Sequence, residues 1–438
     1  MHRRVVVTGL GIIAPNGIGK ENFWEACVSG RSGVGRITRF DSSPLPVQIA
    51  GEVASFDAMA LGVTEKEMVY LDRPTQFAIA AANMALEDAG LLDRLSELER
   101  ERTGVFMGSA MAGVDELEKL WVRLTENGSH FPREAKEQGA PIVTRLMTHT
   151  YAATIAIHHQ LYGPNTSLAT ACAAGGDAIG EAFLAIREGY ADRMLAGGAD
   201  SAISPAGINV FAILGALSTR NEEPERASRP YDGLRDGFVM AEGAAVLLLE
   251  EREAALARNA HIYAELLSFS SNINAHHMTA PPPDGAPLQQ LLRQALREAG
   301  VSYEQLGYIN SHGSSTPPNE VAETAAYKAV FGELAYRIPI SATKSLIGHA
   351  QGASSAIEAV ATALTLERQV IHPTINQEQP DPRCDLDYVP NVARRATVNV
   401  ALTHSSGFGG VNGALVLARP EWVDAQEQAF VKEQKGRE

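Results

Sequence analysis

Cysteine is scarce in this sequence, and the few cysteines form neither a disulfide pattern nor a zinc pattern. The 438 residues contain only Cys27, Cys172 and Cys384, with no CxxC pair among them. Such wide spacing argues against a disulfide framework and against a zinc site, and it fits a reducing compartment. We therefore assign no metal site.

Positive charge is also in short supply. Lys and Arg number 37 against 52 Asp and Glu, which gives a formal net charge of −15. A nucleic-acid partner requires clustered Lys and Arg to neutralise its phosphates. The charge balance therefore argues against nucleic acid as a partner.

Long hydrophobic runs suited to a membrane are absent as well. Residues 5–14 follow His2-Arg3-Arg4 and mimic a signal peptide, but Pro15-Asn16-Gly17 comes next without a small-residue cleavage site. Residues 201–219 carry no charge, yet Ser, Pro, Gly and Asn interrupt them. That stretch predicts a buried helix or loop near an interface rather than a membrane span. We expect no membrane association and a cytoplasmic location.

The glycines near the N-terminus do not indicate a nucleotide cofactor. Gly9-Leu10-Gly11 with Ala14 gives only a loose dinucleotide-binding fingerprint. Pro15-Asn16-Gly17 would break the helix that must follow, and no acidic residue is suitably placed after a second strand. We expect no cofactor.

A repeated pattern divides the chain into two α/β halves. A helix is expected from Asp72 to residues 85–90, with a strand into a Gly/Ser turn at 105–109, and the same succession recurs at 295–300 and 308–313. The turn at Cys172 is echoed by residues 341–352. These repeats predict a duplicated fold. We place the N-terminal half at residues 1–252, the C-terminal half at 253–420, and a polar tail, a frayed helix or disordered, at 421–438.

Cys172 is the first candidate for chemistry. It stands between an uncharged strand-like run and a helical pattern of small residues, as a nucleophile at a helix N-terminus would. The free N–H groups and dipole there stabilise a thiolate, whereas an ordinary thiol with a pKa of about 8.5 is mostly protonated at neutral pH. A buried core cysteine is the alternative for Cys172 taken alone.

Two histidines and a lysine in the second half form the rest of the candidate site. His312 ends a strand before small hydroxylated residues, and His349 follows Gly348 in a turn before a helix, five residues after Lys344. Taken singly, the three residues also fit a solvated turn histidine, a helix-capping histidine and a surface lysine. The duplication places these loops opposite Cys172, which favours a shared catalytic site.

From residue 5 to about 419 the sequence resembles the β-ketoacyl-[acyl-carrier-protein] synthases, the type II elongating condensing enzymes of the thiolase superfamily. The resemblance implies a thiolase-like fold, in which duplicated βαβαβ halves form a five-layered α-β-α-β-α body. Several motifs carry it in the order that the family has, in addition to those of Cys172, His312 and His349: Leu217-Ser218-Thr219-Arg220, Arg229-Pro230-Tyr231-Asp232, Arg235-Asp236-Gly237-Phe238-Val239, His277-Met278-Thr279 and Gly407-Phe408-Gly409-Gly410.

The resemblance also implies an activity. Cys172 would accept an acyl chain from an acyl carrier protein, and neutral His312 and His349 would stabilise the oxyanion formed when a malonyl group on a carrier protein loses CO₂. Lys344 would orient the site, with Glu358 holding it. The product is a β-ketoacyl-carrier protein, made for fatty acid, polyketide or polyene synthesis.

The family pattern implies substrate-binding positions and partners too. Ser314, Thr316 and Thr279 would bind the phosphopantetheine arm, Phe408 would gate the entrance, and Met111 and Phe211 would line the acyl pocket, although core packing would equally explain these last two. Besides the acyl carrier protein, the resemblance implies a homodimer or a heterodimer with a related ketosynthase-like subunit.

Some positions depart from the family pattern. His404-Ser405-Ser406 stands where Asn-Ser-Phe is usual, so Ser406 is expected to open space beside Phe408. Basic residues that usually meet the carrier protein are replaced here by Met68-Val69-Tyr70 and by Gly215. A further departure is Ser354-Ser355 in place of Ala-Gly. These departures favour a specialised polyketide or polyene enzyme as readily as fatty acid synthesis.

Two other functions fit the sequence less well. A non-catalytic subunit that only sets chain length would lack the nucleophile, whereas this chain has Cys172, both histidines and Lys344. A thiolase would need a second catalytic cysteine near the C-terminal Gly-rich turn, and Cys384 lies too early for that role.

Overall fold

Two groups of five strands build the sheet of the molecule. The computed structural model describes residues 2–130 and 141–435. The first group lies in the N-terminal part and the second in the C-terminal part: β1 (Val5–Ala14), β5 (Thr103–Gly108), β6 (Asn165–Leu168), β7 (Arg193–Ser201) and β8 (Glu242–Glu251), then β9 (Ala264–Ile273), β10 (Tyr308–Asn310), β11 (Ile340–Ser341), β14 (Val400–Ser406) and β15 (Val411–Ala418). Shorter strands form a hairpin with β1 and two small ribbons: β2 (Gly17–Ile18), β3 (Gly35–Arg36) with β4 (Ile49–Ala50), and β12 (Val370–Ile371) with β13 (Arg394–Arg395).

The two groups have the same strand order. The first runs β6-β5-β7-β8-β1 and the second β11-β10-β14-β15-β9. The central strand of each parallel trio, β5 or β10, pairs in parallel with both neighbours, while the remaining pairs are antiparallel. The groups meet where β1 pairs with β9. This correspondence confirms the duplication predicted from the repeats.

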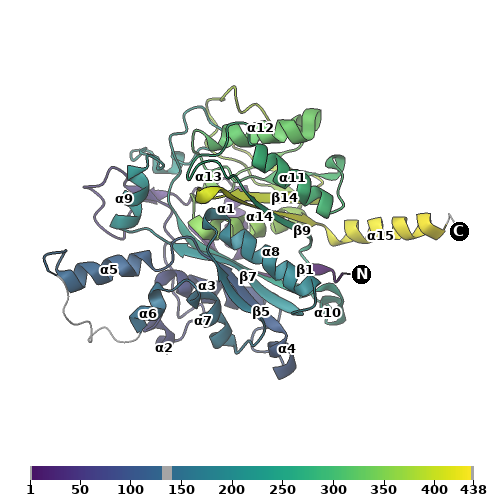
Figure 1. Cartoon of the computed structure of the whole chain (residues 1–438), viewed down its shortest axis with the longest axis horizontal. Coiled ribbons are helices and arrows are strands. Elements are labelled where there is room, and N and C mark those ends of the chain that lie inside the picture. The colour runs from purple at the N-terminus through teal and green to yellow at the C-terminus, as the bar shows by residue number, and fades with distance from the viewer. Residues whose placement is uncertain (1, 131–140, 436–438) are drawn as a thin grey trace.

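Helices complete five layers around this sheet (Figure 1). The layers are formed by α3 (Arg73–Asp88) and α7 (Thr150–His159) outside the first group, α8 (Ala174–Arg187) and α14 (Ser354–Arg368) between the groups, and α11 (Ala286–Glu298) with α12 (Asn319–Phe331) outside the second. The other helices are α1 (Lys20–Val28), α2 (Glu65–Met68), α4 (Glu97–Glu101), α5 (Val114–Thr125), α6 (Pro141–Leu146), α9 (Pro205–Ile213), α10 (Arg252–Ala257), α13 (Lys344–Ile347) and α15 (Pro420–Lys435).

Local sequence explains how α3 begins and what it covers. The Asp72 carboxylate accepts the N–H of Thr75 at 3.1 Å, and Pro74 occupies the first turn, where its missing N–H costs nothing. Such a cap contributes about 1 kcal/mol. Phe77 and Ile79 are then buried in the core over the first group of strands.

The central helices α8 and α14 begin almost in contact. A Cβ on Gly175 would lie 2.7 Å from the carbonyl oxygen of Gly352, closer than real side chains come. Only glycine therefore allows the two helix starts to meet. This contact joins the two halves at the point where both sets of candidate residues lie.

The C-terminal tail is helical over Pro420–Lys435. In Figure 1, α15 extends away from the body. Its first turns are held by Asp424, which accepts a hydrogen bond from Arg4 at 2.9 Å and from Arg252 at 2.7 Å. Of the two states expected for this tail, the structure shows the helix, while residues 436–438 lie outside the described part.

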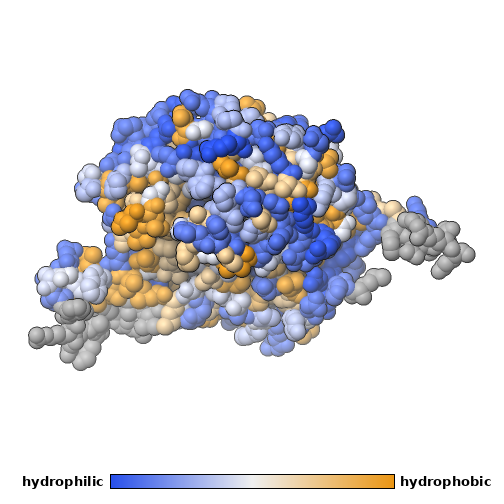
Figure 2. Space-filling view, turned by 45° about the horizontal axis from the view of Figure 1, so that its top comes forward, coloured by the Kyte–Doolittle hydropathy of each residue, from blue (hydrophilic) through white to orange (hydrophobic). Residues whose placement is uncertain are grey.

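Apolar side chains gather on one side of the surface. Figure 2 shows hydrophobic residues collected in the region of α5 and α9. Ile213 is 84% exposed, and Val210, Leu214 and Leu117 are also more than half exposed. The uncharged stretch 201–219 is thus partly exposed, which suits a surface that meets a partner.

In the described ranges, no helix combines the length and hydropathy needed to cross a membrane.

Candidate active site

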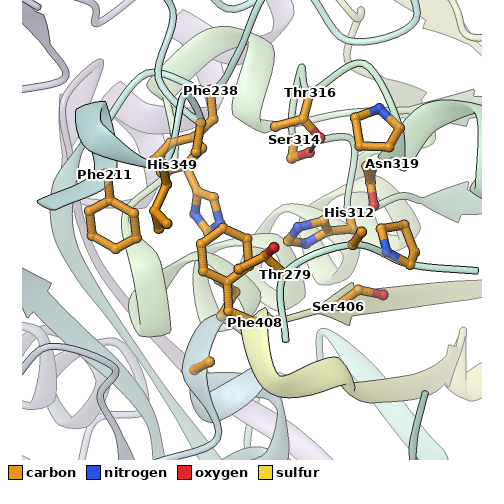
Figure 3. Close-up of a pocket in the computed structure, with 18 of the residues that line it drawn as sticks. Phe211, Phe238, Thr279, His312, Ser314, Thr316, Asn319, His349, Ser406 and Phe408 are labelled. Atoms are coloured by element: carbon orange, nitrogen blue, oxygen red, sulfur yellow. Dashed lines mark hydrogen bonds between the residues drawn. The ribbon is translucent and has the colours of Figure 1, made fainter. Parts of the chain in front are cut away.

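Loops from both halves enclose a cavity of about 330 Å³. Cys172, His312 and His349 all line it. So do all the residues that the sequence suggested for substrate binding: Met111, Phe211, Thr279, Ser314, Thr316 and Phe408. Figure 3 shows Phe211 and Phe238 on one side of this space, Ser314, Thr316 and Asn319 on the other, and the two imidazoles between them.

A sharp backbone turn presents Cys172 to the cavity. The residue lies in a 3-10 turn, Ala171–Ala173, between β6 and α8. Ala171 has φ of 51°, in the left-handed region that a non-glycine residue rarely adopts. The second half repeats this geometry, since Gln351 has φ of 50° and a 3-10 turn, Gln351–Ala353, precedes α14. The repeated strain at two equivalent sites is typical of functional turns.

The environment of the Cys172 sulfur keeps it a thiol at rest. Desolvation raises its pKa to about 11, although the charge of Lys344 and the backbone N–H of Phe408, which donates to the sulfur, act in the opposite direction. This differs from the activated thiolate that the sequence suggested. The physical reason is that the apolar surroundings remove more hydration than these two groups replace.

His312 is held with a proton on Nε2. The Lys344 ammonium has three N–H groups, and it donates to the His312 carbonyl at 2.7 Å, to the His312 Nδ1 at 3.2 Å and to the Glu358 carboxylate. A ring nitrogen that accepts from an ammonium carries no proton itself. Burial, and next the charge of Lys344, hold the pKa of His312 well below its usual range. The neutral ring therefore has its Nε2–H available as a donor.

His349 also carries its proton on Nε2, but other groups donate to its Nδ1. Its Nδ1 accepts the backbone N–H of Gln351 at 3.2 Å and lies 2.9 Å from the hydroxyl of Ser354. Burial and the Lys344 charge also lower the pKa of this ring well below its usual range. The two rings stand with centroids 5.4 Å apart at 80°. Two neutral N–H donors can therefore converge on one oxygen atom.

Lys344 is fully buried behind the two histidines, so the surface-lysine alternative is wrong. Its partner Glu358, on α14, is also fully buried. Burial raises the pKa of Glu358, and the adjacent Lys344 opposes that rise. The ion pair keeps a positive charge close to both rings, where it disfavours their protonation.

The sequence did not reveal every residue that shapes this site. Asp200, at the end of β7, accepts the Ser109 hydroxyl and the N–H groups of Ala110 and Gly352, at 2.7 to 2.8 Å. It thereby ties the loop that carries Met111 to the start of α14. Burial raises the pKa of Asp200 to about 6. In the sequence, Asp200 could be noticed only as an acidic residue directly before the uncharged stretch 201–219. Its hydrogen-bond partners could not be foreseen, because they lie far away along the chain.

The turn at Phe408 closes one side of the cavity. Gly409 and Gly410 both have φ of 84°, and the Gly409 N–H donates to the Met278 carbonyl at 2.7 Å. Phe408 lies 6.2 Å from Phe211 between ring centroids. Ser406 lines the cavity too, on the Asn319 side of Phe408 in Figure 3. That Ser406, being smaller than the phenylalanine usual at this position, leaves room beside the phenyl ring of Phe408 stays a prediction.

In the ranges 2–130 and 141–435, no group of three or more His, Cys, Asp and Glu is placed to hold a metal ion. The Asn412 amide instead donates to the side-chain oxygens of Asn272 and Asn274, at 2.9 and 2.8 Å.

Comparison with known families identifies the chain. Residues 2–255 match the model described as beta-ketoacyl synthase, N-terminal domain, and residues 263–378 match the C-terminal domain of the same family. The chain belongs to the β-ketoacyl synthase family. It is an acyltransferase of the ketosynthase class, as the resemblance implied.

The relatives of this ketosynthase include 3-oxoacyl-[acyl-carrier-protein] synthases and polyketide beta-ketoacyl synthases. The chain is 44% identical to 3-oxoacyl-[acyl-carrier-protein] synthase 2 of Synechocystis sp., over 95% of this chain and 98% of that protein. It is 43% identical to the actinorhodin polyketide putative beta-ketoacyl synthase 1 of Streptomyces coelicolor, over 97% of this chain and 90% of that protein.

Solved ketosynthase structures share the fold. A type II polyketide ketosynthase in complex with its acyl-carrier protein is 38% identical with a TM-score of 0.87, over 95% of this chain and 99% of that one. The ishigamide ketosynthase/chain length factor is 34% identical with a TM-score of 0.88, over the same shares of the two chains. The thiolase-like fold expected from the sequence is thereby confirmed.

Proposed function

We propose that this ketosynthase condenses an acyl chain held on Cys172 with a malonyl group on an acyl carrier protein, releasing CO₂ and a β-ketoacyl-carrier protein. The observation that carries the proposal is the convergence of one thiol and two neutral imidazole N–H donors on a single cavity, with a buried lysine behind them.

In the first step, the Cys172 sulfur attacks the thioester carbonyl of an acyl-carrier protein. A C–S bond forms to Cys172, the C–S bond to the carrier arm breaks, and the thiol proton of Cys172 leaves on the departing carrier thiol. Because a proton is lost from one sulfur and gained by the other, the exchange consumes no proton overall, and the attacking species is the Cys172 thiolate. Lys344 and the Phe408 N–H, which both act to lower the thiol pKa, favour that thiolate.

In the second step, malonyl-carrier protein enters in place of the departed carrier. Its terminal C–C bond breaks, CO₂ leaves, and the electron pair forms an enolate whose oxygen accepts the Nε2–H groups of His312 and His349. One such donor contributes about 3 to 4 kcal/mol to a transition state. The neutral rings suit this task, since a donor without net charge does not hold the malonate carboxylate as an ion pair.

In the third step, the enolate carbon attacks the acyl-Cys172 carbonyl. The new oxyanion would accept the N–H groups of Cys172 and Phe408, and its collapse expels the Cys172 sulfur as a thiolate that takes up one proton. The N–H of Phe408 already points at this sulfur.

The cavity walls suit an acyl chain delivered on a carrier arm. Ser314 and Thr316 hydroxyls lie 2.9 Å apart on one wall, where with Thr279 they would bind the amides of a phosphopantetheine arm. Met111 and Phe211 would face the acyl chain. We propose an acyl carrier protein as the partner, a dimer with a second copy or a related subunit, and a cytoplasmic location, which the three free cysteines support.

The chain-length-setting subunit remains the second candidate function. The complete set of Cys172, His312, His349 and Lys344 in one cavity favours the catalytic role. The relatives include a 3-oxoacyl-[acyl-carrier-protein] synthase and a polyketide beta-ketoacyl synthase, so we propose fatty acid and polyketide synthesis as two uses of the same reaction.

The proposal is tested by separating the two half-reactions. Cys172→Gln is expected to abolish condensation and to keep decarboxylation of malonyl-carrier protein. His312→Ala and His349→Ala are expected to slow decarboxylation about a hundredfold or more, because each removes an oxyanion donor, while Cys172 is still acylated.

Radiolabelled CO₂ release and intact-protein mass measure the two half-reactions. Cys384→Ala, which changes a buried cysteine outside the cavity, is the matched control and is expected to retain both. A folded Cys172→Gln protein that still condenses would refute the assignment of the nucleophile.

A further inference from the structure

Ser354 is a buried hydroxyl that the proposed reaction does not use directly. It is the first residue of α14, it has no exposed surface, and its Oγ lies 2.9 Å from the Nδ1 of His349. The neighbouring Ser355 makes an unrelated contact, because its Oγ accepts the N–H of Gly176 at 2.8 Å.

The direction of the Ser354 hydrogen bond follows from a second contact. The backbone N–H of Gln351 donates to the same Nδ1 at 3.2 Å. A backbone N–H cannot reverse its role, so Nδ1 must be the unprotonated nitrogen of the ring. Ser354 must then be the donor, and the ring proton must sit on Nε2.

The two cavity histidines are held in parallel ways. The Nδ1 of His312 lies 3.0 Å from the Ser405 hydroxyl and 3.2 Å from the Lys344 ammonium. The Nδ1 of His349 instead faces one hydroxyl and one backbone N–H, neither of which carries a charge. The ring of His349 also packs edge-on against Phe238, with centroids 5.2 Å apart. Ser354 is thus the side-chain donor to His349.

We propose that Ser354 is a positioning residue for decarboxylation, which fixes the tautomer and orientation of His349 so that its Nε2–H meets the enolate oxygen. This inference rests on the proposed function. A second donor at Nδ1 withdraws electron density from the ring and strengthens the Nε2–H as a donor. Loss of the hydroxyl leaves Gln351 as the remaining donor and allows the ring to rotate.

The test measures decarboxylation of malonyl-carrier protein by the full chain in the Cys172→Gln background. Ser354→Ala is expected to lower kcat about three- to tenfold, the effect of one hydrogen bond, without changing KM. Ser354→Thr, which keeps the hydroxyl, is expected to stay within twofold, and so is the matched control Ser355→Ala. Acylation of Cys172 is measured in the otherwise wild-type chain and is expected to be unaffected by Ser354→Ala.

A double-mutant comparison separates positioning from general structure. If Ser354 acts through His349, adding Ser354→Ala to His349→Ala causes no further loss of rate. An equal loss in both backgrounds, or a Ser354→Ala rate equal to that of Ser355→Ala, would overturn the inference. If Ser354→Ala also slows acylation of Cys172, the Ser354→Cys variant is measured in its place, because its S–H is a weaker hydrogen-bond donor of similar volume. Decarboxylation by Ser354→Cys as fast as by the parent protein with Ser354 would then overturn the inference. Absence of decarboxylation in the parent Cys172→Gln protein would instead count against the proposed function itself.

Discussion

At Cys172, burial and nearby charge act in opposite directions. Desolvation raises the thiol pKa to about 11, while Lys344 and the Phe408 N–H favour the thiolate. The residue is nevertheless partly exposed in the cavity, whereas Cys27 and Cys384 are 0% and 6% exposed. Cys172 therefore differs from the other two cysteines in how easily a reagent reaches its sulfur, and not in the fraction of thiolate.

We expect iodoacetamide to alkylate Cys172 before the other two cysteines. Because only the thiolate reacts and the thiol pKa lies near 11, the rate is expected to keep rising from pH 7 to pH 9 rather than level off. Peptide mass mapping over this pH range measures both site and rate. Label found first on Cys27 or Cys384, or a plateau below pH 8, would contradict this account.

Among the elements, the two 3-10 turns before α8 and α14 do most to place the chemistry. Each begins at a residue with positive φ, Ala171 or Gln351, and each leads into a central helix. The first turn presents the thiol, and the second supplies the N–H that fixes His349. The turn at Phe408 contains two glycines of positive φ, Gly409 and Gly410, and it forms another side of the cavity.

The space beside Phe408 is expected to affect substrate choice. Ser406→Phe would fill the room on the Asn319 side, so Phe408 could no longer move aside for a stiff chain. We expect slower acylation of Cys172 by polyene chains and little change with saturated chains of equal length. Stopped-time mass spectrometry gives both rates, and the saturated chain is the internal control. An equal change in the two rates would remove Ser406 as a determinant of specificity.

For the whole molecule, the site exists only because two similar halves face one another. The thiol comes from the first half and both imidazoles from the second, and β1 and β9 join the halves into one sheet. The limits 1–252 and 253–420 remain our proposal for the two domains. On the outer surface, β6 ends the strand order and apolar side chains of α9 are exposed, features that a partner subunit would cover.

A dimer is therefore expected in solution. Burying the exposed α9 residues and pairing the β6 edge would both favour association at micromolar concentration. Sedimentation velocity of the active protein, with and without high salt, measures it, and an apolar interface should survive the salt. A monomer that is fully active at micromolar concentration would contradict this expectation.

The duplicated α/β fold and the candidates Cys172, His312, His349 and Lys344 could be predicted from the amino-acid sequence, because repeated motifs, turn glycines and the resemblance to a known family can all be read along the chain. How these residues behave depends on the folded molecule. The raised pKa of Cys172, the Nε2–H tautomers, and the contacts of Asp200 and Ser354 depend on burial and on partners supplied by distant segments. Desolvation and hydrogen-bond geometry are properties of the assembled interior, which no local pattern encodes.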